Sequence, residues 1–402
     1  MNAFILYADT CLTPNEVIHN ACVLCRDGLI GAVGGRSAFS GLDEVPFIRR
    51  SGCTIIPGLI DTHVHGGGTF DLLSLEEQPE NGAGFSRFLA EHGVTSFLPS
   101  IQGLTFERTV ALAARLASLC EAGDGLPGAV PAGIHFEGPF LNSSPDARGD
   151  IPLESLVPVD LGRARDLLAA ARGHTSIVTF APELERSDLL LAWLRENGVV
   201  PSMGHTMANE TAAMRAIDGG ATRCAHFFNG MPPLRQRDIS LTAVAITDDR
   251  VTIELIADGI HVHPRMVRLA CRAKPNPRVV LVSDAIVGAG LEEGRFMYGT
   301  REVEVDGQRA MDTATGRLAG SCICLDGALR NFLAISPFLN RQDAFACATA
   351  NAAESIGLND RGRIQPGRRA DLTVLDAQDQ VVMTVVGGRI VYDREAATTT
   401  GS

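Results

Sequence analysis

Histidine side chains stand at the ends of apolar segments in this sequence, where a metal centre would draw its ligands. The first such segment ends in His63-Val-His65 and is followed by three glycines. Residues two apart in a strand point to the same face, so these imidazoles would lie side by side and could share one cation. The glycines would let the backbone approach a ligand closely. We therefore predict that His63 and His65 can bind a metal.

A carboxylate and two more histidines extend this set. Glu137 ends the apolar segment 133–137, where an unpaired charge is very costly, so this side chain must be paired, protonated or bound to a metal. His205 and His226 end two later apolar segments. The three side chains together would leave one coordination position open for water. An arginine salt bridge to Glu137, or purely structural histidines, are the alternatives.

A second acidic residue, Asp284, follows the apolar segment 279–283. A carboxylate beside a metal could act as general base and then as general acid. Without the ligand set it would equally be a helix N-cap. A second His-x-His, at His261 and His263, lies beyond its strand in a loop. We interpret His261 as a substrate contact and His263 as structural.

Short apolar segments must position these side chains, and they alternate with segments of helical periodicity. The predicted strands are 54–65, 94–99, 133–137, 176–181, 199–205, 222–226, 252–257 and 279–283, and the clearest helices are 106–121, 161–172, 187–197 and 207–218. This spacing predicts a (β/α)₈ TIM barrel rather than a dinucleotide-binding fold. Short strands and turns at both ends predict an additional small β-sandwich. The expected α/β architecture is a barrel over 53–361 with a β-sandwich domain from 1–52 and 362–402.

Composition excludes several other classes of protein. The net charge of −12 over 402 residues would repel a polyphosphate backbone, which argues against nucleic acid as a partner. Lys274 is the sole lysine, so Schiff-base and P-loop lysine mechanisms are disfavoured. The G-x-S-x-G and P-loop motifs are absent, and Gly288, Gly290 and Gly294 miss the Rossmann spacing.

The same sequence features suggest a location. The ten cysteines are scattered along the sequence. This pattern indicates that most of them are small buried side chains of a protein in a reducing compartment. The N-terminus lacks the basic and apolar regions of a signal peptide. No apolar run reaches the ~20 residues that span a bilayer. We therefore expect a cytoplasmic protein with no membrane partner.

Several motifs, taken together and in order, resemble the amidohydrolase superfamily. They are 57–65 (PGLIDTHVH), 135–142 (HFEGPFLN), 204–206 (GHT), 226–234 (HFFNGMPPL), 257–264 (ADGIHVHP), 281–285 (LVSDA) and 318–321 (LAGS). Within that superfamily the sequence is similar to the N-acetylglucosamine-6-phosphate deacetylase family. The resemblance covers nearly the whole chain and implies a metal-dependent hydrolase with a TIM barrel.

The resemblance also implies roles for individual residues. In that family the glutamate and the two later histidines bind the principal metal, which here would be Glu137, His205 and His226, while the His-x-His can hold a second ion. The implied cofactor is one or two divalent ions per subunit, zinc foremost, with iron, manganese or cobalt as alternatives. The implied contacts with an amino sugar phosphate are Asn229, Gly230 and His261. Arg237 matches an arginine that reaches into the neighbouring subunit's site, which implies a homodimer.

One position departs from the family pattern. The family carries a histidine after its Glu-Gly-Pro motif that contacts the substrate carbonyl oxygen, whereas Ile151 stands in that place here. Isoleucine cannot donate a hydrogen bond, and loss of one such donor costs roughly 10²–10³ in rate. Either another group polarises the carbonyl, such as the metal or Arg148, or the substrate differs.

The expected reaction is therefore hydrolysis of the N-acetyl group of N-acetylglucosamine 6-phosphate, or of a closely related 2-acetamido sugar phosphate, with Asp284 as general base and acid. The alternatives are another amide, such as an unphosphorylated or secondary-metabolite N-acetyl amino sugar or a substrate of a cyclic-amide hydrolase or deaminase, and a non-catalytic sugar-phosphate-binding barrel. Lys274 does not follow a predicted strand, which argues against the branch that bridges two metals with a carbamylated lysine.

Overall fold

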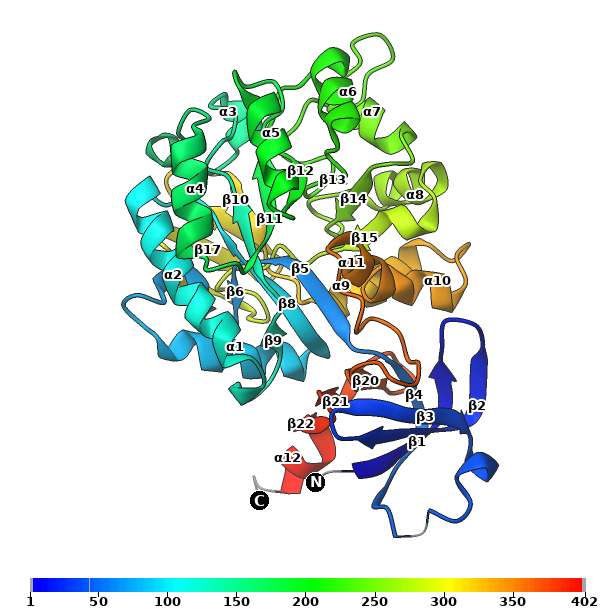
Figure 1. Ribbon diagram of the computed structural model, residues 1–402. Helices are drawn as coiled ribbons and strands as arrows, with labels where there is room; N and C mark the ends of the chain where they lie inside the picture. Colours follow the sequence, from blue (N-terminus) through cyan, green and yellow to red (C-terminus); the bar gives the residue numbers. More distant parts are fainter. Residues whose placement is uncertain (1–2, 43, 400–402) are drawn as a thin grey trace.

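The computed structural model describes residues 3–42 and 44–399 and contains a barrel and a smaller sheet beside it (Figure 1). The predicted α/β fold class is confirmed. Residues 1–2, 43 and 400–402 of the predicted terminal domain lie outside the described residues. No helix in the described part of the chain is long and apolar enough to cross a membrane.

Eight parallel strands form the barrel sheet, and each overlaps one predicted strand. They pair in the order β15-β14-β13-β12-β11-β10-β8-β5, and the short β9 (Val130–Pro131) pairs with β8. Their bounds are β5 Leu59–Val64, β8 Val94–Ile101, β10 Ile134–Glu137, β11 Thr175–Phe180, β12 Val200–Met203, β13 Arg223–Cys224, β14 Thr252–Leu255 and β15 Val279–Leu281. Across the seam between β15 and β5, Asp284 N donates to His63 O at 2.9 Å. The seam therefore brings two predicted site residues together.

Helices surround the barrel, since each crossover between parallel strands packs its apolar face on the sheet (Figure 1). The four helices predicted from periodicity appear as α2 Phe106–Ala122, α4 Leu161–Ala170, α5 Ser187–Glu196 and α6 Glu210–Gly219. The others are α1 Glu80–Glu91, α3 Pro145–Arg148, α7 Leu241–Thr247, α8 Pro264–Ala273, α9 Leu325–Ile335, α10 Arg341–Ala346, α11 Ala350–Ser355 and α12 Arg394–Thr399. Short 3₁₀ turns are at Arg36–Phe39, Leu72–Ser74, Gly123–Gly125, Leu153–Ser155 and Asn276–Arg278.

Strands from both ends of the chain form one seven-stranded sheet, drawn side by side in blue and red in Figure 1. The strands are β1 Ala3–Leu12, β2 Val17–Arg26, β3 Leu29–Gly35, β4 Phe47–Pro57, β20 Leu372–Leu375, β21 Val381–Val386 and β22 Arg389–Asp393. Leu29 on the edge strand bridges to Arg369 just before β20, so the sheet curls over its own core. That core includes Phe4, Val23 and Val385, each at most 2% exposed.

The structure corrects the predicted strand 54–65. The segment is two strands, because β4 ends at Pro57 in the terminal sheet and β5 begins at Leu59 in the barrel. Gly58 stands between them, where a Cβ atom would lie 2.2 Å from Thr95 Oγ1. Only glycine, which has no Cβ atom, permits this close approach. Packing against Thr95 therefore requires glycine at the junction between β4 and β5.

A four-stranded antiparallel sheet that the sequence analysis missed follows the last barrel strand. It consists of β16 Glu293–Tyr298, β17 Arg301–Asp306, β18 Arg309–Asp312 and β19 Leu318–Ser321. A two-stranded ribbon, β6 Gly66–Gly67 with β7 Phe70–Asp71, follows β5. The inserted sheet brings new side chains to the C-terminal end of the barrel.

Candidate active site

A cavity of about 270 Å³ opens at the C-terminal ends of the barrel strands. Active sites of TIM barrels lie at this end, because the loops after several strands converge there. Seven of the predicted site residues line the cavity: Glu137, His205, His226, Asn229, Gly230, His261 and Asp284. The structure therefore brings most of the predicted set into one place.

The Glu137 carboxylate lies at the centre of the predicted ligands. Its Oε1 is 2.9 Å from both His205 Nε2 and His226 Nε2. Its Oε2 is 3.4 Å from His63 Nε2 and 3.3 Å from His65 Nε2. Burial raises the pKa of Glu137, but the charge of His63 and the hydrogen bonds from His205 and His226 outweigh burial and hold that pKa well below its usual value. An ionised carboxylate thus faces four imidazoles.

The other nitrogen of His205 and of His226 is already engaged. His205 Nδ1 donates to Ala147 O at 2.8 Å, and His226 Nδ1 donates to Asn229 O at 3.2 Å. In the neutral rings that would bind a metal, each Nε2 therefore carries a lone pair, whereas a hydrogen bond to Glu137 requires a second proton on the ring. The two Nε2 atoms lie 3.0 Å apart, where two lone pairs repel one another unless a cation or a proton lies between them.

His63 and His65 are fully buried and form the second half of the site, with Glu137, His205 and His226 as the first half. His63 Nδ1 donates to Glu254 Oε2 at 2.9 Å, and His65 Nδ1 donates to Ser100 O at 3.0 Å. The remaining atoms, His63 Nε2, His65 Nε2 and Glu137 Oε2, are buried and without a hydrogen-bond partner among the described residues. Three unpartnered polar atoms that converge on one point would be costly in an apolar interior.

These observations fit a metal centre with one carboxylate shared between two halves. Glu137, His205 and His226 can place one ligand atom each around one ion, and His63, His65 and Glu137 can do so around another. A bound cation would satisfy the unpartnered nitrogen and oxygen atoms and remove the repulsion between the two Nε2 atoms. The donor set of histidine nitrogen and carboxylate oxygen suits zinc and other divalent transition metals.

Asp284 stands beside both histidines of the second half. Its Oδ1 is 3.2 Å from His65 Nε2 and 3.5 Å from His63 Nε2. Burial raises the pKa of Asp284, but the charge of His63 and the close approach of His65 outweigh burial and lower it. The ordinary alternative, a helix N-cap, is wrong, because β16 and not a helix is the next element after β15.

Backbone turns aim three of these side chains into the cavity. His205, His226 and Asp284 have positive φ angles of 46°, 25° and 50°. Residues other than glycine rarely adopt this conformation, and they do so chiefly where the surroundings enforce it, as at functional sites. All three lie just past strands shorter than predicted, so a turn rather than the strand sets the direction of each side chain.

The predicted sugar-phosphate contacts lie along the same cavity. His261 lines it, and its Nδ1 is 2.6 Å from Asp258 Oδ2. Gly230 has a φ of 60°, and a Cβ atom there would lie 2.9 Å from Ala147 O and 3.1 Å from His205 Nδ1. Because a side chain at Gly230 would displace a candidate ligand, the position requires glycine.

Arg237, Ile151 and Arg148 do not line the cavity. Arg237 lies on the exposed stretch 233–238. Ile151 is 1% exposed and packs in the protein interior. The Arg148 guanidinium donates to Ile151 O at 2.6 Å, so it is already engaged. Neither Ile151 nor Arg148 can therefore meet a substrate carbonyl in this arrangement.

Three further residues, His263, His135 and Lys274, lie outside the ligand set. His263 Nδ1 accepts a hydrogen bond from Arg265 N at the start of α8, which is a structural role. His135, also inside the barrel, is held by Ser100 Oγ at 3.0 Å and Thr179 Oγ1 at 2.8 Å, so neither of its ring nitrogens is left for a metal. Lys274 caps the end of α8, where its Nζ donates to Asp248 O.

Sequence reasoning missed four polar residues that line the cavity: Gln102, Asp146, Asp150 and Arg317. Gln102 directly follows β8, and its place at a strand end was a usable signal. Asp150 is held by Arg301 of the inserted sheet. Arg317 precedes β19 of that sheet, so the unpredicted insertion concealed its role.

Comparison with known proteins gives the family of this chain. The sequence model of the Amidohydrolase family matches residues 54–391. The chain belongs to the amidohydrolase family. The resemblance inferred from the motifs is thus confirmed, and the match spans the whole barrel.

Individual amidohydrolases are similar over nearly the full chain. N-acetylglucosamine-6-phosphate deacetylase of Bacillus subtilis (strain 168) is 32% identical over 396 residues, 95% of each chain. N-acetylgalactosamine-6-phosphate deacetylase of Escherichia coli O157:H7 is 30% identical over 389 residues, 96% of this chain and 98% of the relative. A Mycobacterium smegmatis N-acetyl-D-glucosamine-6-phosphate deacetylase, solved as a mutant in complex with N-acetyl-D-glucosamine-6-phosphate, has a TM-score of 0.89 at 29% identity and covers 98% of this chain and 100% of its own.

A third group of possible metal ligands lies outside this amidohydrolase site: His92, Cys324 and Asp326. His92 Nδ1 is 3.0 Å from Asp326 Oδ1, and Arg330 donates to Asp326 Oδ2 at 2.7 Å. Two cationic groups therefore already neutralise this carboxylate. We interpret the group as an ion pair that joins the end of α1 to the start of α9.

The variant His92→Gln tests that ion pair. Burial lowers the pKa of His92, but the hydrogen bonds with Asp326 and Cys324 outweigh burial and raise it to about 10. Because the unfolded pKa is about 6.5, the charged pair stabilises the fold fully below that pH and loses this effect as the pH rises toward the folded-state pKa. We expect the variant to lose about 2 kcal/mol of stability at pH about 6 and much less near pH ~10.

The measurement is the difference in Tm between wild type and His92→Gln at the two pH values. His19→Gln is the matched control, because His19 is an exposed histidine on β2. A Tm difference that is equal at both pH values would contradict the ion-pair interpretation.

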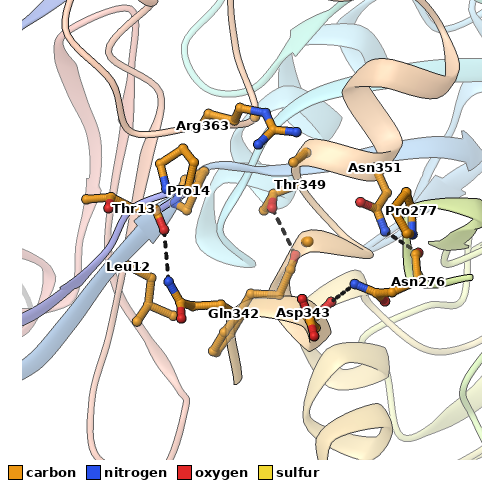
Figure 2. A pocket seen from close by; sticks show the side chains of 15 residues that line it. Leu12, Thr13, Pro14, Asn276, Pro277, Gln342, Asp343, Thr349, Asn351 and Arg363 are labelled. Carbon is orange, nitrogen blue, oxygen red and sulfur yellow. Dashed lines mark hydrogen bonds between the residues drawn. The ribbon is translucent and has the colours of Figure 1, made fainter. Parts of the chain in front are cut away.

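Another hollow, of about 200 Å³, lies between the terminal sheet and the start of β15. Figure 2 shows that several of its polar side chains are held by hydrogen bonds, including Gln342 Nε2 to Thr13 O at 3.1 Å and Asn351 Nδ2 to Asn276 O at 2.8 Å. None of the predicted metal or substrate residues lines it. Its residues join the two parts of the protein, and we assign it no chemistry.

Proposed function

We propose that this amidohydrolase removes the acetyl group from a 2-acetamido sugar phosphate, N-acetylglucosamine 6-phosphate or its galacto epimer, giving acetate and the amino sugar phosphate. The observation that carries the proposal is the Glu137, His205 and His226 set with Asp284 in the same cavity. Relatives that are similar from end to end carry the name of this activity for one epimer or the other. A complete ligand set also favours an enzyme over a non-catalytic barrel.

Glu137, His205 and His226 would hold the principal ion, and His63 and His65 would hold a second one with Glu137. We propose zinc for at least the first position. When bound, the metal lowers the pKa of water and polarises the amide carbonyl. The hydrogen bonds at each Nδ1 keep the histidine rings oriented with Nε2 toward the ion.

Asp284 performs the proton transfers in this proposal. Its carboxylate is ionised and takes the proton from the attacking water as the new C–O bond forms. It then gives that proton to the nitrogen of the sugar, because the amine is too basic to leave as an anion. The C–N bond breaks to give acetic acid and the free amine, and the acid then loses its proton to become acetate.

Arg237 from a second copy of the chain would bind the substrate phosphate in a homodimer. Support comes from its exposed position, outside its own cavity. We expect Arg237→Ala to raise KM for the phosphorylated sugar about 10-fold, the loss of one charge-assisted hydrogen bond. KM and kcat for the unphosphorylated sugar should not change. Arg235→Ala, on the same exposed stretch, is the control, and equal effects of both variants would contradict the assignment.

The experiment that tests the function is release of acetate from three substrates by protein stripped of metal and reloaded with zinc or manganese. The substrates are N-acetylglucosamine 6-phosphate, its galacto epimer and unphosphorylated N-acetylglucosamine. Fast turnover of one phosphorylated sugar supports the proposal. Equal rates with and without phosphate, or no turnover of any of them with metal bound, would contradict it.

We also propose residues 53–361 as the catalytic domain and residues 1–52 with 362–402 as a second domain, in a protein of the cytoplasm. The terminal strands pack into a core cluster of their own, which supports the division. Strand β4 continues to Pro57, so the connection between the proposed domains is a continuous extended segment rather than a flexible linker.

A further inference from the structure

Gln102 stands at the end of β8 with a side chain that the predicted mechanism does not use. It lines the active-site cavity and is 6% exposed. Its Nε2 lies 2.9 Å from the hydroxyl oxygen of Tyr298. Its Oε1 is buried and has no hydrogen-bond partner among the described residues. A buried, unpartnered amide atom in a polar cavity points to a missing ligand.

The hydrogen bonds of Tyr298 indicate which amide atom is free. In the arrangement above the hydroxyl accepts from Gln102, and its own hydrogen finds no acceptor in the described part of the chain. Turning the amide by 180° lets Tyr298 donate to Oε1 and leaves Nε2 without a partner in the site. The two ends of an amide are distinguished only by such a network. In the turned arrangement the Tyr298 hydroxyl and Gln102 Oε1 are paired with each other, so the group left free is the Nε2 N–H donor.

The elements around Gln102 hold this donor beside the metal centre. The Tyr298 ring lies edge-on to His65, with 5.8 Å between ring centroids. The Arg301 guanidinium lies 4.8 Å over the Tyr298 ring and forms an ion pair with Asp150. The inserted sheet thus holds the Tyr298 side chain in place, and the Tyr298 hydroxyl holds the Gln102 amide in place. A donor held in this way loses little freedom when it binds substrate.

We propose that Gln102 Nε2 donates a hydrogen bond to the carbonyl oxygen of the scissile amide, the role for which Ile151 has no donor. The inference rests on the proposed deacetylation and names the residue that binds the acyl group. Ile151 is buried outside the cavity, and the Arg148 guanidinium donates to Ile151 O. Neither side chain can therefore contact the acyl group. Negative charge develops on this oxygen as water attacks, and a fixed donor is most effective there.

The variant Gln102→Leu removes the donor and keeps the size of the side chain. We expect kcat to fall about 10²-fold, as for loss of one oxyanion donor, with KM and metal content nearly unchanged. An analogue with a tetrahedral methylphosphonamidate in place of the acetamide should bind about 10²-fold more weakly, because it carries the developed charge. The amino sugar phosphate product has no acyl group and should bind equally well.

Two further variants separate this role from a structural one. Tyr298→Phe removes the hydroxyl that orients the amide, and its kcat should fall less than that of Gln102→Leu. Gln378→Leu, at an exposed glutamine in the turn before β21, is the matched control and should behave as wild type.

The outcomes distinguish this inference from the proposed function. Wild-type protein that binds metal but releases no acetate overturns both. Active wild-type protein with an unchanged Gln102→Leu overturns the Gln102 role alone. Equal loss of analogue and product binding in Gln102→Leu also overturns it, because that pattern indicates a damaged site rather than a lost donor.

Discussion

Asp284→Asn is expected to lower kcat about 10³-fold while the protein keeps its metal, because the amide can neither take nor return a proton. The substitution preserves the shape of the side chain and one oxygen atom. The backbone hydrogen bond from Asp284 N to His63 O does not depend on the side chain, so the seam of the barrel should persist. The loss should therefore appear in kcat at nearly constant KM for the sugar phosphate.

The measurement combines steady-state kinetics with metal analysis of the same sample. Asp312→Asn is the matched control, since Asp312 is a buried aspartate of the inserted sheet that lies outside the cavity and keeps its acceptor oxygen as asparagine. Near-wild-type turnover of Asp284→Asn with metal still bound would assign the proton transfers to another group. Loss of metal together with turnover would instead make Asp284 a ligand.

The barrel could be predicted because its signal is local and repeated. Apolar strands recur at the interval of βα units, and all eight predicted strands overlap observed ones. Strand ends were less predictable. The sequence suggests a strand that runs to His226, yet β13 ends at Cys224, because a left-handed turn at His226 leaves the sheet to reach the cavity. A contact distant in sequence, the hydrogen bond from His226 N to Glu254 Oε2 at 3.0 Å, holds this turn, and periodicity does not record such contacts.

The inserted sheet could not be predicted for a different reason. Its strands β16 and β17 are short and polar, with alternate exposed residues such as Glu302 and Glu304, and in sequence they look like loops. They become strands by pairing with one another over buried Val303 and Val305. The role of Gln102 was hidden in turn, because the tyrosine that orients it belongs to this insertion.

The metal ligands were predictable because they are rare residue types at strand ends, but the sharing of one carboxylate between two halves was not. The sequence shows that Glu137 and His65 each end an apolar segment. Each Glu137 oxygen faces a different pair of histidines. This pairing depends on how side chains from different strands meet in three dimensions, which the sequence does not record. This sharing makes Glu137 the single residue on which both halves of the site depend.

Glu137→Gln is therefore expected to abolish metal binding in both halves and to lower kcat/KM by at least about 10³-fold, more than the 10–100-fold typical of losing a group behind a ligand. The amide removes the negative charge that attracts a cation. Its NH₂ group can donate hydrogen bonds to the histidine Nε2 atoms. The lone pairs of these atoms are then no longer available to a metal ion.

Metal analysis and Tm with and without a chelator check this expectation. A bound ion stabilises the folded state by about 4 kcal/mol at a thousandfold excess over Kd, so chelation should lower the Tm of wild type and leave that of Glu137→Gln unchanged.

His65→Ala gives the contrast, since it removes one ligand of the second half and leaves the first set, Glu137, His205 and His226, complete. Glu196→Gln, at an exposed carboxylate that ends α5, is the control and should bind metal as wild type does. Full metal content in Glu137→Gln would mean that the histidines alone hold the ion. The shared carboxylate would then serve to orient them, and the two halves of the site would be independent.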